Sequence, residues 1–316
     1  MRIVLTGASG SLGRALMARL TREGAERIVI FSRDEHKRVA LERDFGWHPG
    51  VRVYSGDIRD RERLVDLFAG CDVVVHAAAR KMVAAHPDEP REMLQTNVLG
   101  TVNVIVAAKA AGVRKLLFIS SDKASSAANC YGTTKALAEY LVVNENARTY
   151  QSGLRMSVLR YGNVIASNGS IVVSWRQCVA HGRPFPISDA TMTRFWLTLP
   201  QAVGFVIQAL ADLRGGEIFV PRLPAAPLIR IAQALTNDGD VIQFKQIGIR
   251  PGGEKLHEEL LSAAEIRRTR VRNGFYVVPP FQSDQMWDNK PWLGESLLPG
   301  FTYNSETWPW QLSVEE

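Results

Sequence analysis

The chain has 316 residues, of which 46% are hydrophobic and 22% are charged, values that are ordinary for a globular protein. It contains no apolar stretch of the roughly 20 residues that span a membrane, and its net charge of +6 comes without the basic run that nucleic-acid binding favours. Three widely spaced cysteines form neither a disulfide framework nor a metal-ligand pattern. We therefore expect a cytoplasmic protein without signal peptide, membrane contact, nucleic-acid partner or metal.

The first predicted element is a strand over residues 2–6, which a glycine-rich turn and a helical pattern follow. Glycines recur at positions 7, 10 and 13, the spacing that binds a dinucleotide pyrophosphate between a strand and a helix. In that setting the first glycine takes the tight turn, the second lets the backbone approach the pyrophosphate, and the third lets helix and strand pack closely. The predicted cofactor-binding residues of this turn are Gly7, Ser9, Gly10, Ser11, Leu12 and Gly13.

The second predicted strand, residues 27–31, ends where a dinucleotide-binding protein contacts the adenosine ribose. An acidic residue at that place binds the 2′-hydroxyl of NAD, whereas a basic residue suits the 2′-phosphate of NADP. Ser32, Arg33 and Lys37 therefore favour NADP. Asp34, which lies between the two basic residues, keeps NAD open as the alternative.

Short β-rich segments alternate with helical segments over the first half of the chain. This alternation predicts an α/β fold with a doubly wound parallel sheet, the Rossmann architecture, whose ligands bind at the carboxyl ends of the strands. The predicted strands are 2–6, 27–31, 51–54, 72–76, 115–120 and 155–161. The residues after the third and fourth strands are expected to contact the adenine and to leave room for the cofactor: Asp57, Ile58, Ala77, Ala78 and Ala79.

The composition changes at about residue 166, where glycine and proline become commoner and the predicted strands become shorter. We therefore predict an NAD(P)-binding domain over residues 1–165. Residues 166–316 are expected to form a smaller substrate-binding part, with some of the chain returning to the Rossmann core. The tail after Pro279 is expected to wrap irregularly over the surface or to contact another subunit; its tryptophans are Trp287, Trp292, Trp308 and Trp310.

A Tyr-x-x-x-Lys pair follows the fifth predicted strand. Tyr131 and Lys135 are four residues apart, so on a helix they share a face. There the lysine charge is expected to favour the phenolate and to lower the pKa of the tyrosine. Such a phenolate can take the proton of a sugar hydroxyl while a nicotinamide takes the hydride.

Asp122 and Lys123 predict a second step after this oxidation. A 4-keto sugar has an acidic proton at C5, and a base together with an acid can eliminate water across C5 and C6. A lysine serves as that base only if its pKa lies below the usual value of about 10.4. Burial in a closed cleft and the neighbouring charge of Lys135 are both expected to lower the pKa of Lys123.

The sequence resembles the extended short-chain dehydrogenase/reductases over nearly its whole length, from Thr6 to about Pro280. Within them it is similar to the soluble nucleotide-sugar 4,6-dehydratases, and most to the inverting UDP-N-acetylglucosamine 4,6-dehydratases of pseudaminic acid biosynthesis. It keeps the tyrosine that the membrane-anchored retaining relatives typically replace by methionine. Besides the glycine turn and Tyr-x-x-x-Lys, the motifs that carry the resemblance are Ser32–Asp34, His76–Lys81, Gln95–Asn97, Ser121–Ala124, Arg160–Val164, Met192–Trp196 and Arg250–Glu258.

The resemblance implies a role for each residue of the central segment. Tyr131 would be the base at the C4 hydroxyl, and Lys135 would hold the nicotinamide ribose. Lys123 would abstract the C5 proton, Asp122 would protonate the departing C6 hydroxyl, and Ser121 would hydrogen-bond the C4 oxygen. The hydride would return to C6 and C5 would be reprotonated on the opposite face, so that the NADP stays tightly bound and is regenerated.

The resemblance also implies contacts to a UDP-sugar and to other subunits. A guanidinium forks onto phosphate oxygens, so two arginines are expected at the diphosphate. Relatives are usually dimers or larger, and the stretches Arg91–Ala111 and Lys135–Ala147 are the expected contacts of a homo-oligomer. The expected ligand contacts are Asn97 for the cofactor, Lys81 and Asn163 near the sugar or diphosphate, Arg194 and Arg250 at the diphosphate, and Glu254 at a ribose hydroxyl.

Two other functions remain open from the residues alone. An epimerase or 4-ketoreductase of the same fold would act on a nucleotide sugar without losing water, and it would not need Asp122 or Lys123. A non-catalytic NADP-binding sensor would not need the Tyr-x-x-x-Lys pair, which this chain has kept. The chain departs from the usual family pattern at 82–84, 166–170 and Gly253, so its motifs specify the reaction class more closely than the sugar.

Overall fold

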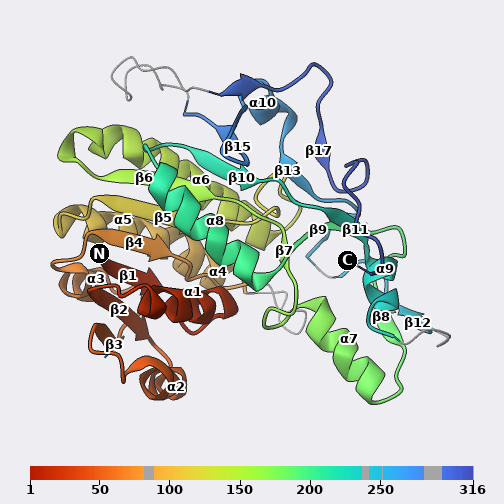
Figure 1. The fold of residues 1–316 in the computed structure, drawn as a ribbon, viewed down its shortest axis with the longest axis horizontal. Helices are drawn as coiled ribbons and strands as arrows, with labels where there is room; N and C mark the ends of the chain where they lie inside the picture. The colour runs from red at the N-terminus through yellow and green to blue at the C-terminus, as the bar shows by residue number, and fades with distance from the viewer. Residues whose placement is uncertain (82–88, 237–241, 251, 281–293, 316) are drawn as a thin grey trace.

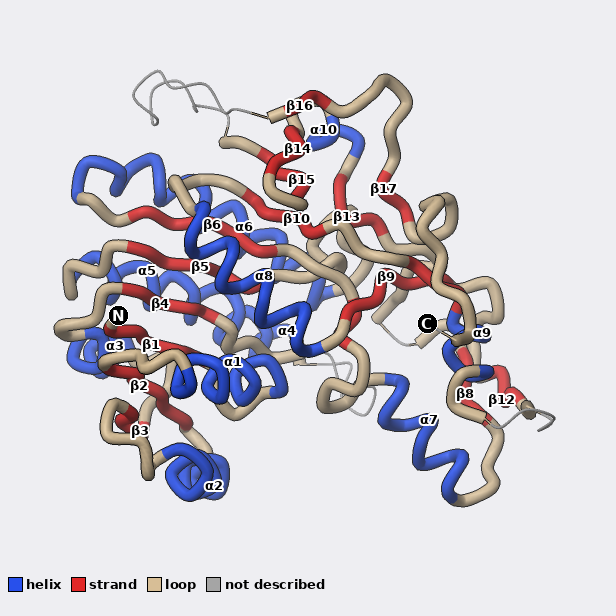
Figure 2. Tube along the Cα trace, viewed as in Figure 1, coloured by secondary structure: helices blue, strands red, loops and turns tan. Residues whose placement is uncertain are grey.

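The computed structural model of the chain describes residues 1–81, 89–236, 242–250, 252–280 and 294–315. Within these residues the main body is a ten-stranded sheet, and three smaller sheets lie beside it (Figure 1, Figure 2). The strands of the large sheet run in the order β16-β14-β15-β10-β6-β5-β4-β1-β2-β3. Their bounds are β1 (Arg2–Thr6), β2 (Arg27–Ser32), β3 (Val51–Ser55), β4 (Val73–His76), β5 (Lys115–Ile119), β6 (Arg155–Leu159), β10 (Ile218–Pro221), β14 (Arg270–Arg272), β15 (Phe275–Val278) and β16 (Glu295–Ser296).

The pairing of the strands is that of a doubly wound sheet. β1 pairs in parallel with β2 on one side and with β4 on the other, and the parallel pairing continues outward to β3 and through β5 and β6 to β10. The α/β Rossmann fold predicted from the alternation is therefore confirmed. All six predicted strands are present, although the sixth ends at Leu159 rather than at residue 161.

Helices cover both faces of the sheet because parallel strands need crossover connections. α1 packs against α8 on one face, and α3, α5 and α6 pack in a row on the other (Figure 1). The helical elements of this part are α1 (Ser11–Arg22), α2 (Glu35–Phe45), α3 (Arg61–Phe68), α4 (Pro90–Met93), the π-helical turn η1 (Leu94–Leu99), α5 (Gly100–Ala110), α6 (Cys130–Thr149), the 3₁₀ turn η2 (Tyr150–Ser152) and α8 (Leu199–Asp212).

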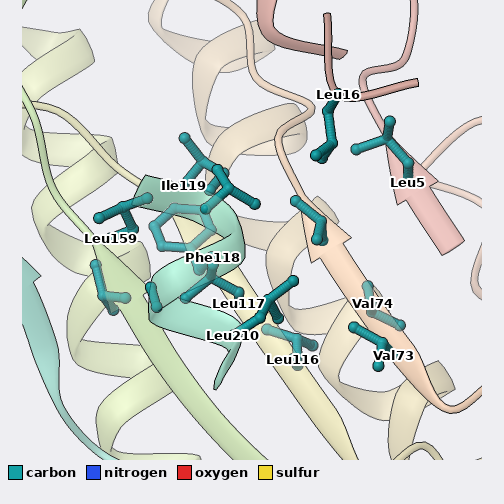
Figure 3. Close-up of a cluster of buried hydrophobic side chains, with 14 of the residues drawn as sticks. Leu5, Leu16, Val73, Val74, Leu116, Leu117, Phe118, Ile119, Leu159 and Leu210 are labelled. Atoms are coloured by element: carbon teal, nitrogen blue, oxygen red, sulfur yellow. The ribbon is translucent and has the colours of Figure 1, made fainter. Parts of the chain in front are cut away.

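The main hydrophobic core lies between this sheet and its helices. Leu116 to Ile119 of β5 are all buried, because helices cover both faces, and the strand is therefore a continuous apolar run rather than an alternating one. Figure 3 shows these residues beside Leu210 of α8, with Val73 and Val74 of β4 between them and Leu5 of β1. Full burial of one such leucine side chain contributes roughly 1.5–3 kcal/mol, so the many buried side chains fix the strand ends on which the site is built.

The C-terminal part has small sheets and a second hydrophobic cluster. Trp175, Phe185 and Trp196 are central to that cluster, which is separate from the main core. The small sheets contain β7 (Asn163–Val164), β9 (Thr193–Leu197) and β11 (Ala225–Pro227); β8 (Phe185–Ile187) and β12 (Phe244–Gln246); and β13 (Glu259–Leu261) and β17 (Tyr303–Asn304). The helices here are α7 (Ile171–Ala180), α9 (Leu228–Gln233) and α10 (Ala263–Ile266).

The C-terminal tail packs more closely than the sequence predicted. Trp308 is buried in the main core, where its ring lies 4.6 Å from that of Tyr303, and only Trp310 is substantially exposed among the described tryptophans of the tail. A surface wrap is thus wrong for Trp308, because aromatic packing draws it inward. Trp287 and Trp292 lie outside the described residues. No helix in the described part of the chain has the length and apolar character to cross a bilayer.

Candidate active site

A cleft of about 860 Å³ runs along the carboxyl ends of the central strands and into the C-terminal part. It is lined by every cofactor residue that was predicted from a strand end: Gly7, Ser9, Gly10, Ser11, Leu12, Gly13, Ser32, Arg33, Lys37, Asp57, Ile58, Ala77, Ala78 and Ala79. Asn97 does not line the cleft. Its buried amide accepts from the Arg80 backbone N–H at 2.7 Å and donates to Thr134 Oγ1 at 3.1 Å, so it supports the cleft wall from behind.

The glycine turn is shaped to receive a dinucleotide. Gly7 has a φ of +74°, and a Cβ there would lie 2.7 Å from the backbone of Ala77. A Cβ at Gly13 would lie 2.4 Å from the carbonyl oxygen of Gly7, so this glycine permits close packing of strand and helix. No side chain caps the first turn of α1, so its N–H groups and positive dipole end can receive a phosphate. The turn therefore fits a pyrophosphate.

The end of β2 presents basic side chains to the cleft. Arg33 is about half exposed and its Nη1 lies 3.7 Å from Asp57 Oδ2. The carboxylate of Asp34 instead accepts from the backbone N–H of Lys37 at 3.1 Å and caps α2. Asp34, the acidic residue that left NAD as the alternative cofactor, therefore caps a helix.

Tyr131 and Lys135 lie in the first turns of α6, and both line the cleft. Burial raises the pKa of Tyr131 to about 12, although the charge of Lys123 and a hydrogen bond with Ser121 act against the rise. Lys135 donates to the Ile119 carbonyl at 2.5 Å and lies 3.9 Å from the centre of the Phe118 ring. The prediction that Lys135 lowers the pKa of Tyr131 is therefore wrong for this state, because Lys123 supplies the cation that acts on the phenol.

Burial also acts on Lys135 itself. It lowers the pKa of this ammonium to about 7, against the opposing charge of Glu139. The packing of α6 on the preceding loop is tight, since a Cβ at Gly132 would lie 2.2 Å from the carbonyl oxygen of Lys123. This close approach holds the start of α6 beside the Asp122–Lys123 segment.

Lys123 is surrounded by acceptors. Its Nζ lies 2.8 and 2.9 Å from the two carboxylate oxygens of Asp122 and 2.9 Å from Asn163 Oδ1. Asp122 is fully buried, and it also accepts from Ser121 Oγ at 2.7 Å. Burial lowers the pKa of Lys123, but the charges of Asp122 and Glu258 outweigh burial, so its pKa is raised. The expected lowering is wrong because these carboxylates face the ammonium and Lys135 does not.

Two charged residues of the site were not singled out from the sequence. Glu258 is buried, and its Oε1 lies 3.3 Å from Lys123 Nζ. Lys255 Nζ lies 2.8 Å from Glu258 Oε2 and donates to the Ser125 carbonyl at 2.8 Å. Both belong to the Arg250–Glu258 segment, where opposite charges three residues apart indicate that Lys255 and Glu258 form an ion pair. The sequence does not indicate their contact with Lys123, because Lys123 is more than 130 residues away in the chain.

The predicted substrate residues all line the cleft, although most already have partners in the protein. Arg194 is buried and donates to the backbone carbonyls of Thr193 and Leu256 at 2.7 and 2.9 Å. Glu254 accepts from the backbone N–H of Arg250 at 3.1 Å, and their side chains lie 3.7 Å apart.

The other two predicted sugar-side residues approach the cleft near Lys123. Asn163 holds Lys123 by the hydrogen bond described above, and Lys81 donates to the Asn168 carbonyl at 3.3 Å. Burial and the charge of Lys123 lower the pKa of Lys81. The described residues include no group of three His, Cys, Asp or Glu side chains that could hold a metal ion.

A family model with the description "Polysaccharide biosynthesis protein" matches residues 3–280. The chain belongs to this family. A relative from Campylobacter jejuni, named UDP-N-acetylglucosamine 4,6-dehydratase (inverting), is 36% identical over 322 residues, which cover 99% of this chain and 95% of the relative. A relative from Rickettsia akari, named UDP-glucose 4-epimerase, is 35% identical over 286 residues, which cover 88% of this chain and 82% of the relative.

The solved structures agree on the fold of this family member. The X-ray structure of Pen from Bacillus thuringiensis has a TM-score of 0.90 and 29% identity, and the match covers 99% of this chain and 94% of that one. The dTDP-glucose 4,6-dehydratase DesIV from Streptomyces venezuelae, solved with NAD and TYD, has a TM-score of 0.65 and 22% identity over 78% of this chain and 88% of that one. Because relatives of nearly equal identity are named a dehydratase and an epimerase, the side chains of the cleft must decide between the reactions.

Proposed function

We propose that the protein is a nucleotide-sugar 4,6-dehydratase that acts on UDP-N-acetylglucosamine and inverts C5. The observation that carries the proposal is the contact of Lys123 Nζ with both carboxylate oxygens of Asp122 beside Tyr131. An epimerase needs only a base at the C4 hydroxyl, whereas a dehydratase also needs an acid and a base for C6 and C5. The identity to a dehydratase over nearly the whole chain supports the same reading.

Oxidation at C4 is the proposed first step. Tyr131 acts in its phenolate form, which takes the proton of the C4 hydroxyl and becomes the phenol. The ammonium of Lys123 favours that phenolate, since its charge lowers the pKa of Tyr131 against the effect of burial. Ser121 hydrogen-bonds the C4 oxygen in this proposal. NADP bound along the glycine turn would supply the hydride acceptor at C4 and later the hydride donor at C6.

Elimination of water is the proposed second step, and it requires a prior proton transfer. Lys123 is held as an ammonium, so it must lose a proton before it can act as a base. Asp122, at 2.8 Å, can accept that proton. The neutral amine of Lys123 then takes the C5 proton, and protonated Asp122 gives its proton to the C6 oxygen, which leaves as water. Lys123 ends as the ammonium and Asp122 as the carboxylate, so the pair returns to its initial charges. When the hydride returns to C6, C5 takes a proton that comes from solvent on the opposite face, which completes the proposed inversion.

The ligands of the proposed reaction have separate places in the cleft. NADP is the proposed cofactor, because Arg33 and Lys37 line the ribose end while Asp34 caps α2. Residues 166–316 are the proposed substrate-binding part, since they bring Arg194 and the Arg250–Glu254 pair to the UDP-sugar.

The proposed assembly is a cytoplasmic homo-oligomer. Free thiols at all three cysteines suit a reducing compartment. The two stretches expected to contact another subunit carry exposed apolar side chains, among them Leu99, Val106, Leu137 and Tyr140. Exposed apolar side chains on neighbouring helices are typical of surfaces that another protein covers.

The test is incubation with UDP-N-acetylglucosamine in deuterium oxide, followed by proton NMR. We expect a new C6 methyl signal and deuterium at C5, with coupling constants that report inversion. Lys123→Met and Asp122→Asn should abolish this signal, whereas Lys245→Met, on the exposed strand β12, should not. Consumption of the UDP-sugar by both site variants, or a C4 epimer in place of a 6-deoxy product, would instead establish the epimerase.

A further inference from the structure

Glu258 is held in the cleft by contacts that fix its backbone as well as its carboxylate. Its backbone N–H donates to Ser305 Oγ at 2.8 Å, and Ser305 Oγ in turn donates to the Thr193 carbonyl at 3.1 Å. All three residues are buried. The carboxylate is therefore aimed at Lys123 from a backbone that the C-terminal tail and β9 hold in place.

The carboxylate of Glu258 is shared among three cations. Lys255 lies at 2.8 Å, Lys123 at 3.3 Å and Arg194 Nε at 3.9 Å. A buried carboxylate is costly unless it is paired in this way. Lys255 and Arg194 also donate hydrogen bonds to backbone carbonyls, so both are fixed in the protein. Glu258 therefore links Lys123 to two side chains that the backbone holds in place.

The three N–H donors of the Lys123 ammonium match the three residues around it. Asp122 and Asn163 accept at 2.8–2.9 Å, and Glu258 lies at 3.3 Å on the remaining donor. The charged and titratable groups that act on Lys123 or face it are Asp122, Glu258, Arg194, Lys81 and Tyr131. Only two of these, Asp122 and Glu258, are carboxylates. Without Glu258, the single negative charge of Asp122 would face the three positive charges of Lys123, Lys255 and Arg194.

We propose that Glu258 is a positioning residue that keeps Lys123 protonated and directed at Asp122 and Asn163 in the substrate-free cleft. The consequence for catalysis rests on the proposed function: the ammonium assists the phenolate of Tyr131 in the oxidation, and it gives its proton to Asp122 before the elimination. Glu258 itself touches neither the reacting atoms nor the cofactor in this role.

The test is a titration of Lys123 followed by NMR of protein labelled with ¹³C at the lysine Cε atoms. The chain has nine lysines, and the Lys123 signal is identified by its loss in Lys123→Arg. Glu258→Gln keeps the shape of the side chain and removes its charge. We expect the titration midpoint of Lys123 to fall by about one to three pH units in Glu258→Gln, the usual effect of one neighbouring charge. Glu258→Asp should keep the midpoint near that of the unsubstituted protein.

The matched control is Glu259→Gln, because the carboxylate of Glu259 accepts from Ser126 Oγ at 2.8 Å instead of facing Lys123. Its Lys123 midpoint should not move. An unchanged midpoint in Glu258→Gln overturns the proposal. A second measurement needs no variant: Lys123 of the unsubstituted protein should remain protonated above about pH 10.4, the ordinary midpoint of a lysine side chain, and a lower midpoint also overturns the proposal.

The same variants separate this proposal from the proposed function. If dehydration occurs and starts from the Lys123 ammonium, the alkaline limb of the kcat profile should shift to lower pH in Glu258→Gln by the same amount as the NMR midpoint. A shifted midpoint in a protein that forms no 6-deoxy product would support the role of Glu258 and refute the dehydratase. Product formation with an unmoved midpoint would do the opposite.

Discussion

Arg160 provides a test of how α6 is held in place. Immediately after β6, it donates from Nε to Glu139 of α6 at 3.0 Å and from Nη2 to Glu265 of α10 at 2.8 Å. Its Nη1 also donates to the Leu260 carbonyl at 3.0 Å. Arg160 and Glu139 are buried, so replacement by methionine would leave two carboxylates without their counterion. The arginine thereby joins α6, which carries Tyr131 and Lys135, to the chain just beyond Glu258.

The expected loss of stability is large. Removal of one partner from a buried ion pair costs about 3–5 kcal/mol, a considerable share of the 5–15 kcal/mol that stabilises a typical domain. We expect Arg160→Met to lose about 4 kcal/mol of unfolding free energy near pH 7. Urea denaturation, followed by both far-UV circular dichroism and tryptophan fluorescence, measures this loss. The control is Arg176→Met on the exposed side of α7, which should change the free energy by less than about 0.5 kcal/mol.

The loss should also depend on pH. Burial alone would raise the pKa of Glu265, but the charge and hydrogen bonds of Arg160 outweigh it and lower the pKa to about 2. Because this folded-state pKa lies below the ordinary value of 4.5, the pair contributes stability above about pH 4.5 and loses it as the pH falls toward 2. The difference between Arg160→Met and the unsubstituted protein should therefore shrink at pH 3–4. A loss below about 1 kcal/mol at pH 7, or one that grows in acid, would refute this reasoning.

Two further predictions concern the cofactor and the assembly. Arg33→Ala should weaken NADP binding about ten- to a hundred-fold and leave NAD binding nearly unchanged in calorimetric titrations, because a hydrogen bond to a charged group contributes roughly 1.5–3 kcal/mol. Equal losses for both cofactors would contradict the proposed NADP preference. Tyr140→Lys, which places a charge at a side chain that is 66% exposed on α6, should reduce the mass measured by light scattering if α6 is a subunit contact. A monomeric unsubstituted protein would contradict the proposed homo-oligomer.

The features that depend on neighbouring residues could be predicted from the sequence. The turn at Gly7 and Gly13 can be predicted because it depends on local sterics. The buried strands can be predicted because they are continuous apolar runs. The strand ends then placed the cofactor residues on one edge. The contact of Asn97 could not be predicted in this way, because its neighbours along the chain do not reveal that its amide accepts from the backbone N–H of Arg80.

Protonation states could not be predicted in the same way, because they depend on groups that are distant in the sequence. The charges that raise the pKa of Lys123 belong to Asp122, its neighbour in the chain, and to Glu258, which is 135 residues further along. Helical spacing correctly grouped Tyr131 with Lys135 on α6, but it did not show that Lys135 turns to the carbonyl of Ile119. Burial, which sets the pKa of both side chains, is a property of the assembled cleft.

The sheet order has a consequence for synthesis of the chain. The neighbour of β6 on its outer side is β10, so the backbone groups on that edge of β6 stay unpaired until Ile218 and its successors have been made. A ribosome adds about 5–20 residues per second, so the roughly 60 residues between β6 and β10 take several seconds. During this interval a nascent chain ending near residue 165 would expose an apolar strand edge, which favours pairing with another chain. Premature termination there would therefore give an aggregation-prone fragment rather than a working nucleotide-binding unit.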